Sequence, residues 1–264
     1  MIPEKLANIR VWHFDQLKRY RQILHFVTDR HGGISKDPYF SLNLSFKVND
    51  NVNSVTKNRE LLAGNLKLNP EQFLYPDQCH TSNVKLVKSI NQEKLAETDA
   101  LITNVPGIFI CVTTADCVPI ILYDPVKHSI GVVHAGWRGL VGSIIIKTID
   151  KMIENFETDP KNLLACIGPS ISSKNYQVGN EVINEVVKLT RYKKGFIYNE
   201  DKSGRGYLDL QEFSRFQLIN VGLDYHKIEI AGICTYDNNN DFYSARKEGF
   251  ETGRFASGIM LNFF

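Results

Sequence analysis

The sequence carries little net charge and no long apolar run. Its 31 Lys and Arg residues stand against 29 Asp and Glu residues, which leaves a formal charge of +2 at pH 7. That excess is too small for the basic surface that sequence-independent nucleic-acid binding requires. No stretch approaches the roughly 20 apolar residues that span a bilayer, and the first 16 residues lack the basic-then-apolar order of a signal peptide. We therefore expect a soluble, cytoplasmic protein without nucleic-acid or membrane partners.

Cysteine is scarce, and the common nucleotide motifs are missing. Five cysteines, an odd number spread over 264 residues, argue against a disulfide framework. Neither GxGxxG nor a phosphate-binding loop ending in Gly-Lys-Ser/Thr occurs. No repeat, low-complexity tract or Pro/Gly/Ser-rich linker marks a boundary, so residues 1–264 are expected to form a single domain.

Along the chain, short continuous apolar runs alternate with segments whose apolar residues recur at helical spacing. Short apolar runs predict buried strands at 108–114, 118–123, 130–134, 163–167 and 228–234. Helical spacing predicts helices at about 54–66, after Gly142, and at about 181–189 and 210–221. Because Asp124-Pro125 predicts a turn that returns 130–134 beside 118–123, hairpin and helical connections occur together. This mixture favours an α/β fold with a mixed sheet over a doubly wound parallel one.

Three side chains with borderline or soft donor atoms lie where the expected strands end: His80, Cys117 and His134. Two imidazoles and one thiolate suit zinc, and three protein ligands leave a coordination position open for water or substrate. The residues are dispersed, however, and no short C-x-x-C or H-E-x-x-H module joins them, so ordinary buried core side chains are the alternative. A further alternative is that Cys117 is a nucleophile activated by His134.

Charged residues near these positions allow two interpretations each. Asp116 interrupts the otherwise uncharged segment 108–123, so it either fixes a metal-bound histidine or holds the turn. Arg138, in a glycine-flanked turn ahead of a helix, either binds an anion with free backbone N–H groups or forms a surface salt bridge. The same two interpretations apply to Arg30, which precedes His31-Gly32-Gly33.

Ordered motifs along nearly the whole chain resemble those of one known family. The motifs are Asp29–Ser35, Ser41–Leu44, Gln78-Cys79-His80, Thr114–Pro119, His134–Gly139, Gly168–Ile171, Tyr176–Gly179, Cys234–Tyr236, Ser244–Arg246 and Thr252-Gly253-Arg254. Together they resemble the family first described as multicopper polyphenol oxidases with a laccase domain and now described as purine nucleoside phosphorylases with adenosine deaminase activity.

The resemblance implies a fold and an activity. The fold would be an α/β sandwich of layered sheets and helices, similar to a bacterial deamidating toxin domain with a Cys–His pair. The ligands of a zinc ion, or of copper as the alternative metal, would be His80, Cys117 and His134. The substrates would be phosphate and purine nucleosides: adenosine, inosine, guanosine and, as a further candidate, S-methyl-5′-thioadenosine. The glycosidic bond would be cleaved with phosphate, and water would replace the 6-amino group of adenosine.

Further site residues follow from this expected chemistry. Arginines can hold phosphate against the anomeric carbon, and our candidates are Arg30, Arg138 and Arg246. Asn43 and Gln78 are candidates for ribose or base contacts, and Asp116 for proton transfer during deamination. Three other functions stay open: polyphenol oxidation at copper, metal-free thiol hydrolysis by Cys117 with His134, and an interaction module without turnover. The sequence carries no signal for an oligomeric state.

Overall fold

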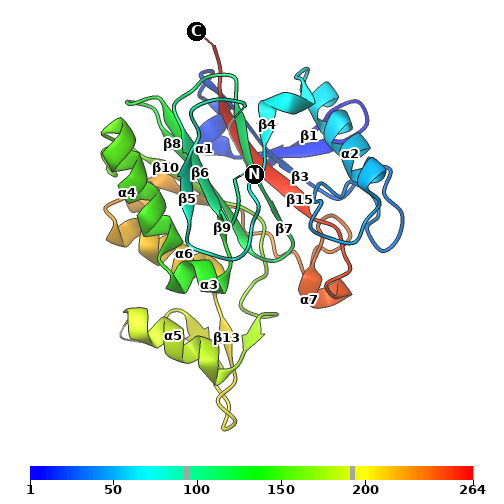
Figure 1. The fold of residues 1–264 in the computed structure, drawn as a ribbon. Coiled ribbons are helices and arrows are strands. Elements are labelled where there is room, and N and C mark those ends of the chain that lie inside the picture. The colour runs from blue at the N-terminus through cyan, green and yellow to red at the C-terminus, as the bar shows by residue number, and fades with distance from the viewer. Residues whose placement is uncertain (92–94, 191–193, 264) are drawn as a thin grey trace.

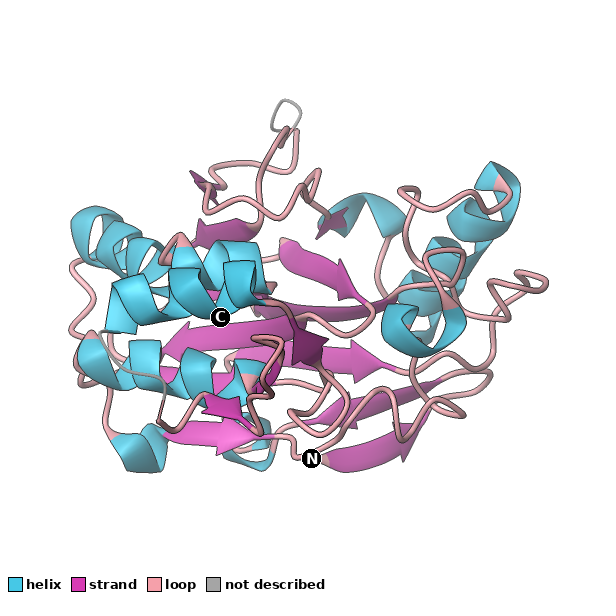
Figure 2. Ribbon diagram, turned by 90° about the horizontal axis from the view of Figure 1, so that it is seen from below, coloured by secondary structure: helices cyan, strands magenta, loops and turns pink. Residues whose placement is uncertain are grey.

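The computed structural model describes residues 1–91, 95–190 and 194–263. Within these ranges two six-stranded sheets and one three-stranded sheet form, and helices lie on either side of the strands (Figures 1 and 2). Both large sheets combine parallel and antiparallel neighbours. The predicted α/β class with mixed sheets is therefore confirmed. None of the helices in the described ranges has the length and apolar character needed to cross a membrane.

The first sheet places the C-terminal strand in its interior. Its spatial order is β1 (Ile2–Lys5), β2 (Arg10–His13), β3 (Ile23–Thr28), β15 (Phe255–Leu261), β7 (Phe109–Thr114) and β4 (Phe73–Leu74). Neighbours are antiparallel except for β4 and β7, which run parallel. Strand β15 thus joins the N-terminal strands to β7, as the red and blue strands show side by side in Figure 1.

The second sheet contains the predicted hairpin. Its order is β14 (Ile228–Ile230), β10 (Leu164–Ile167), β8 (Val118–Asp124), β9 (Ser129–Ala135), β6 (Ala100–Thr103) and β5 (Val84–Leu86). Strands β8 and β9 pair antiparallel, with Val118 opposite Ala135. The Asp124 carboxylate accepts hydrogen bonds from the backbone N–H groups of Val126 (2.9 Å) and Lys127 (3.1 Å). These bonds close the predicted turn.

The two large sheets pack face to face, because their central strands are apolar on both sides. In β8, Ile121 and Tyr123 face a core shared with Ile110 and Phe255 of the first sheet. The alternate residue Ile120 points to the opposite face of β8, into a second core under the helices. A strand buried on both faces has a continuous apolar sequence instead of an alternating one.

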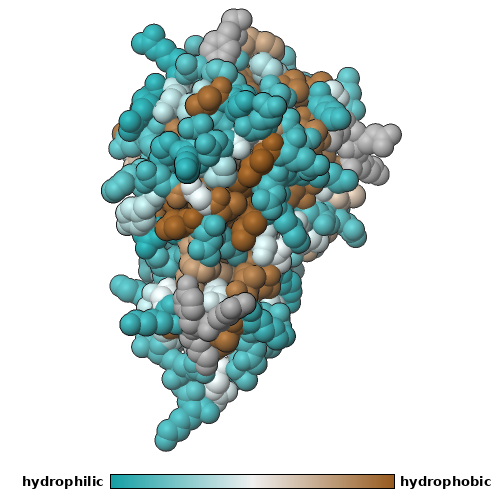
Figure 3. Space-filling model, turned by 90° about the vertical axis from the view of Figure 1, so that its left-hand side faces the viewer, coloured by the Kyte–Doolittle hydropathy of each residue, from teal (hydrophilic) through white to brown (hydrophobic). Residues whose placement is uncertain are grey.

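Helices cover both outer faces of this sandwich. Helix α2 (Val52–Asn65) packs against the first sheet, where Leu62 joins Phe26 and Phe109 in a third core. The second sheet is covered by α3 (Trp137–Val141), α4 (Ile144–Phe156) and α6 (Leu210–Asn220). The outward surface of this helical side is largely hydrophilic, with apolar side chains in a strip between the polar ones (Figure 3).

Smaller elements complete the described chain. Helix α5 (Asn180–Thr190) packs on α3 and on an antiparallel sheet of order β11 (Gln177–Val178), β13 (Gly206–Leu208), β12 (Ile197–Tyr198). The short helices are α1 (Asp15–Lys18), η1 (Pro70–Gln72), η2 (Tyr225–Lys227) and α7 (Ala245–Glu248).

The predicted helices correspond to α2, α4, α5 and α6, with ends that differ by one or two residues. The strand expected over 228–234 is shorter and ends at Ile230. Gly232 has a φ of +66°, which turns the chain out of the strand. A single bridge between Ser170 and Cys234 continues the pairing beyond that turn.

Two connections cross from the first sheet to the second at the same end of the sandwich. Strands β4 and β7 run parallel, so the segments that leave them start at the same edge. The connection from β4 to β5 carries His80, and the connection from β7 to β8 carries Cys117. His134, near the end of β9, lies opposite Pro119 at the start of β8. The fold thereby gathers three residues that are far apart in sequence.

We expect Ile149→Ala to lower the free energy of unfolding by about 2–5 kcal/mol, because this α4 side chain is fully buried and its removal leaves a cavity. Ile153→Ala, on the exposed side of the same helix, should cost less than about 1 kcal/mol. Urea unfolding followed by circular dichroism measures both variants. Equal losses would contradict the packing of α4 on the second sheet.

Candidate metal and substrate site

The structure brings His80, Cys117 and His134 together. One donor atom of each lies within 4.8 Å of the donors of the other two, and Cys117 Sγ is 4.0 Å from His80 Nδ1. The rings of His80 and His134 are 4.9 Å apart and inclined by 64°. His134 is buried, Cys117 is partly buried and His80 is exposed. Two imidazoles and a sulfur at this separation fit zinc or copper, and the exposed side leaves room for a further ligand.

A buried carboxylate that the sequence analysis did not single out holds this group. Asp99 Oδ1 accepts hydrogen bonds from His134 Nδ1 (2.8 Å) and from the backbone N–H of His80 (3.1 Å). Its Oδ2 accepts from the backbone N–H groups of Cys79 (3.2 Å) and Thr81 (2.7 Å), and from the Thr81 hydroxyl (2.8 Å). One side chain therefore orients both histidine-bearing segments. The available sequence signal is a carboxylate immediately before the apolar strand β6.

The electrostatics favour a charged ligand set. Burial opposes ionisation of Asp99, but the hydrogen bonds from His134 and Thr81 lower its pKa to about 2. His134 Nδ1 is consequently a donor, so a metal would bind at Nε2 in place of the proton that this nitrogen carries in the imidazolium form. Burial also opposes charge on Cys117 and His134, but their mutual contact lowers the pKa of Cys117 to about 6 and raises that of His134 to about 9. Without metal, the thiolate is already formed at neutral pH.

Gly136 has no side chain, and this leaves room for the side chains of Cys117 and His80. A methyl group added at Gly136 would lie 3.0 Å from both Cys117 Sγ and His80 Nδ1. Any larger residue would therefore push the ligands apart. Gly136 also begins α3 as its N-cap residue, so the backbone of the His134–Gly139 motif passes directly behind the ligands.

The three residues lie on the wall of a cavity of about 960 Å³. Apart from the histidines, its described lining has two carboxylates, Asp77 and Asp116, and five cations: Lys47, Arg59, Arg138, Arg246 and Arg254. Lys47 pairs with Asp77. No carboxylate in residues 1–91, 95–190 and 194–263 lies within 4.0 Å of the four guanidinium groups. The cavity is thus positively charged and suited to an anionic ligand.

Two of the predicted anion-binding arginines line this cavity. The guanidinium of Arg138 lies 4.4 Å from the ring centre of Trp137, and the side chain is exposed. Arg246 lies 4.9 Å from the ring centre of Tyr176 and donates a hydrogen bond to the Gln177 carbonyl (3.0 Å). Stacking on an aromatic ring fixes the position of each guanidinium without a counter-ion, so its positive charge remains available to a ligand.

Gln78 and Asp116 also line the cavity, and both are hydrogen-bonded to the surrounding chain. Gln78 Nε2 donates to the Thr113 carbonyl and Gln78 Oε1 accepts from the Thr113 N–H, both at 2.8 Å. Asp116 accepts from the Thr235 hydroxyl and from the backbone N–H of Arg246, both at 2.7 Å. These contacts fit the interpretation in which Asp116 holds the turn, whereas the histidine partner is Asp99.

Arg30 and Asn43 lie outside the cavity lining. Arg30 forms an ion pair with Glu248 (2.8 Å), and its guanidinium stacks 4.5 Å from the ring centre of Tyr243. Asn43 is fully buried, donates to Asp50 (2.8 Å) and accepts from the backbone N–H of Arg254 (3.0 Å). The contacts of both residues stabilise loops next to the site.

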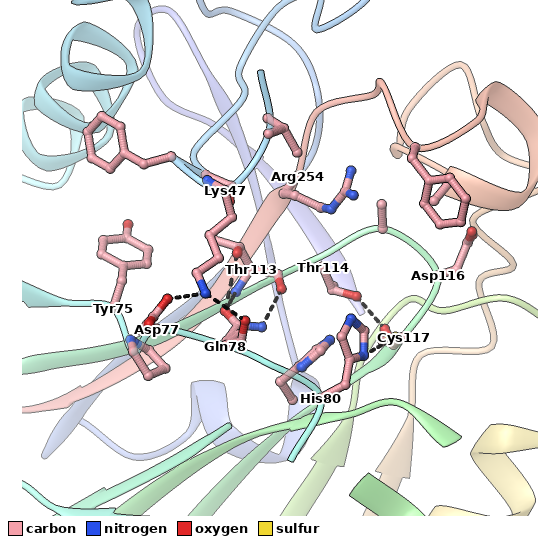
Figure 4. A pocket seen from close by; sticks show the side chains of 18 of the residues that line it. Lys47, Tyr75, Asp77, Gln78, His80, Thr113, Thr114, Asp116, Cys117 and Arg254 are labelled. Atoms are coloured by element: carbon pink, nitrogen blue, oxygen red, sulfur yellow. Dashed lines mark hydrogen bonds and ion pairs between the residues drawn. The ribbon is translucent and has the colours of Figure 1, made fainter. Parts of the chain in front are cut away.

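Arg254 is a cavity residue that sequence reasoning did not assign. Its Nη1 donates to the carbonyls of Thr252 (2.6 Å) and Gly253 (2.9 Å), and the guanidinium points into the cavity above Thr114 (Figure 4). Burial lowers the pKa of Arg254, whereas nearby Cys117 and Asp116 oppose this shift. Its sequence signal was its position directly before β15, at a strand end like the metal-binding candidates.

The fold and this site define an α/β protein with a His–Cys–His group that could hold a metal ion, on the wall of a basic cavity. The model of the family described as "Multi-copper polyphenol oxidoreductase laccase" matches residues 24–262. The chain therefore belongs to this family, as its motifs predicted.

Relatives match along most of their length. A protein of Bacteroides thetaiotaomicron named purine nucleoside phosphorylase is 37% identical over 261 residues, which cover 96% of this chain and 97% of that protein. Purine nucleoside phosphorylase YfiH of Escherichia coli is 36% identical over 237 residues, covering 88% and 91%. The crystal structure of Bacillus licheniformis hypothetical protein YfiH has a TM-score of 0.90 at 29% identity, covering 98% of each chain.

Asp99→Asn should weaken zinc binding by about 10- to 100-fold, because an amide supplies only one acceptor oxygen and no longer orients His134 as a carboxylate does. Asp209→Asn is the matched control. Asp209 caps α6 by accepting from the Glu212 N–H (2.9 Å), a role that Asn fills equally well. Competition with a chromophoric chelator measures both affinities, and unchanged binding in Asp99→Asn would refute the orienting role.

Alkylation of Cys117 in metal-free protein should rise as the pH increases through about 6. Only the thiolate reacts, so a lowered pKa moves the reactive range downward from about 8.5 for an ordinary thiol. Iodoacetamide labelling followed by mass spectrometry of the Cys117 peptide reports the midpoint, and added zinc should protect the sulfur. A midpoint near 8.5, or labelling unaffected by zinc, would speak against the arrangement.

Proposed function

We propose that this protein is a zinc-dependent purine nucleoside phosphorylase that also deaminates adenosine. The observation that carries the proposal is the His80–Cys117–His134 group, which opens onto a cavity whose arginines have no carboxylate partner among the described residues. The names of relatives aligned over nearly the whole chain support it. Zinc is the proposed metal because three N and S ligands with an open position are typical of catalytic zinc, and copper is the alternative. We also infer that residues 1–264 act as one cytoplasmic domain.

In phosphorolysis, the protein holds phosphate against the anomeric carbon while negative charge develops on the departing purine. Arg138 and Arg246 bind the phosphate, and Arg254 joins them as the third arginine near the metal group. Arg30 takes no part in this step, because its charge is paired with Glu248 outside the cavity. The products from adenosine are adenine and ribose 1-phosphate, and inosine, guanosine and S-methyl-5′-thioadenosine are further substrates.

Deamination uses the same cavity with water in place of phosphate, and yields inosine and ammonia from adenosine. A bound zinc ion supplies Lewis acidity at the ligand group. Asp99 keeps His134 in the tautomer that presents Nε2. Asp116, next to Cys117 on the cavity wall, is our candidate for moving the proton between water and the leaving amine. Gln78 contributes by fixing the His80 segment against β7.

Metal-free hydrolysis by Cys117 is the second candidate function. The observation in its favour is the thiolate–imidazolium pair, in which the pKa of Cys117 falls to about 6 beside His134. Such a pair is an activated nucleophile. Polyphenol oxidation fits less well, because the described residues contain one group of three close ligands whereas multicopper oxidation uses many imidazoles.

Incubation of metal-analysed protein with adenosine, with and without phosphate, tests the proposal. Adenine and ribose 1-phosphate should form only with phosphate, and inosine should form in both conditions. Cys117→Ala should lose most of its zinc and both activities, whereas Cys79→Ala, which removes an exposed thiol, should retain them. Absence of purine products would refute the proposal. A covalent adduct on Cys117 in metal-free protein would select the hydrolase instead.

A further inference from the structure

The cavity extends well beyond the metal-binding group. Tyr75 lies on the side opposite His80 and Cys117, with Lys47 and Asp77 between them (Figure 4). Ligand cavities for small molecules generally measure about 300–1,000 Å³, and this one, at about 960 Å³, is near the upper limit. A substrate can therefore react at the metal group and still reach the Tyr75 side.

On the Tyr75 side of the cavity lies the charged guanidinium of Arg59. The guanidinium of Arg59, on α2, lies between the rings of Tyr75 (3.8 Å from the ring centre) and Phe46 (4.4 Å). Its Nε donates to the Leu44 carbonyl (2.9 Å), which fixes the plane of the group. No carboxylate of the described chain lies within 4.0 Å of it. Burial lowers the pKa of Arg59, so its charge is partly desolvated without an internal counter-ion.

The charged neighbours of Arg59 differ from those of the other cavity arginines. Arg254 interacts electrostatically with Cys117 and Asp116, and Arg138 and Arg246 act on Tyr176 together with the same two groups. Arg59 interacts instead with Tyr75 and Cys111, and burial raises the pKa of both, so that they are neutral at pH 7. One phosphate bound by Arg138, Arg246 and Arg254 thus leaves Arg59 without an anion of its own.

We propose that Arg59, held between Phe46 and Tyr75, forms a second anion subsite that binds a phosphate or carboxylate group carried by the substrate, remote from its reacting carbon. The nucleoside part of this inference rests on the proposed function, whereas the anion part rests on the cavity alone. An aromatic pair around a guanidinium leaves its edge free for an oxyanion, and a charge-assisted bond in a desolvated site is stronger than one in water.

Binding of inosine 5′-monophosphate and of inosine to the zinc-loaded protein, measured by calorimetry without inorganic phosphate, tests this subsite, because inosine has no 6-amino group to lose and is not cleaved without phosphate. The monophosphate should bind at least about tenfold tighter than inosine. Arg59→Met should weaken monophosphate binding by roughly 10- to 100-fold and change inosine binding less than about twofold. Arg59→Lys should keep part of the preference, because it retains the charge. Lys57→Met, on the same helix but paired with Glu60 outside the cavity, is the matched control and should bind as the wild type does.

Two outcomes would overturn the inference. One is equal affinity of the wild type for the monophosphate and inosine; titration with inorganic phosphate would then show whether Arg59 holds a second free phosphate instead. The other is equal weakening of both ligands in Arg59→Met, which would make Arg59 a support of the cavity wall. Because binding is measured without turnover, Arg59-dependent monophosphate binding in a protein that forms no purine products would sustain the subsite and remove the proposed function.

Discussion

The site depends on the hydrogen bonds that stabilise the negative charge of one buried carboxylate, Asp99. A charge removed from water costs several kcal/mol unless hydrogen bonds replace its hydration, and Asp99 obtains these bonds from the backbone of residues 79–81, the Thr81 hydroxyl and the His134 ring. These donors belong to two separate segments, a sheet-crossing connection and strand β9. The folded chain cannot satisfy Asp99 without bringing His80 beside His134. The metal-binding geometry is therefore a consequence of an electrostatic requirement of the fold.

The crossings themselves explain why the ligands can converge. A chain that leaves one sheet for the other must abandon the regular strand conformation, and here two non-glycine residues take positive φ values: His80 at +57° and Asp116 at +90°. Such conformations cost on the order of 1–3 kcal/mol each and persist where surrounding contacts hold them. Asp99 holds the first crossing through the backbone N–H of His80, and the Asp116 side chain holds the second through Thr235 and the start of α7. Both strained residues adjoin or belong to the ligand group.

Local patterns in the sequence predict the strands and helices, whereas the contacts within the site depend on pairings between residues that are far apart in sequence. Strands such as the one expected at 118–123, and the helix after Gly142, were predictable because their apolar spacing is uninterrupted. The His–Cys–His group was found because its members lie at strand ends and match a family motif. Asp99 was missed because its partners belong to strands and loops whose adjacency no local pattern shows. Arg30 kept two interpretations, an anion contact and a salt bridge, because its counter-ion, Glu248, is 218 positions away in sequence. Arg59 resembles an ordinary charge on an exposed helix face until Tyr75 and Phe46 are placed around it.

Strand β15 occupies the interior of the first sheet, between β3 and β7, although it follows His80, Cys117 and His134 in the sequence. Strand β7, which leads into Cys117, lacks one of its two neighbours until β15 has paired with it. The His–Cys–His residues are therefore translated before the sheet that positions them is complete. A nascent chain that has not yet reached β15 carries these three side chains without the neighbouring strand that aligns them.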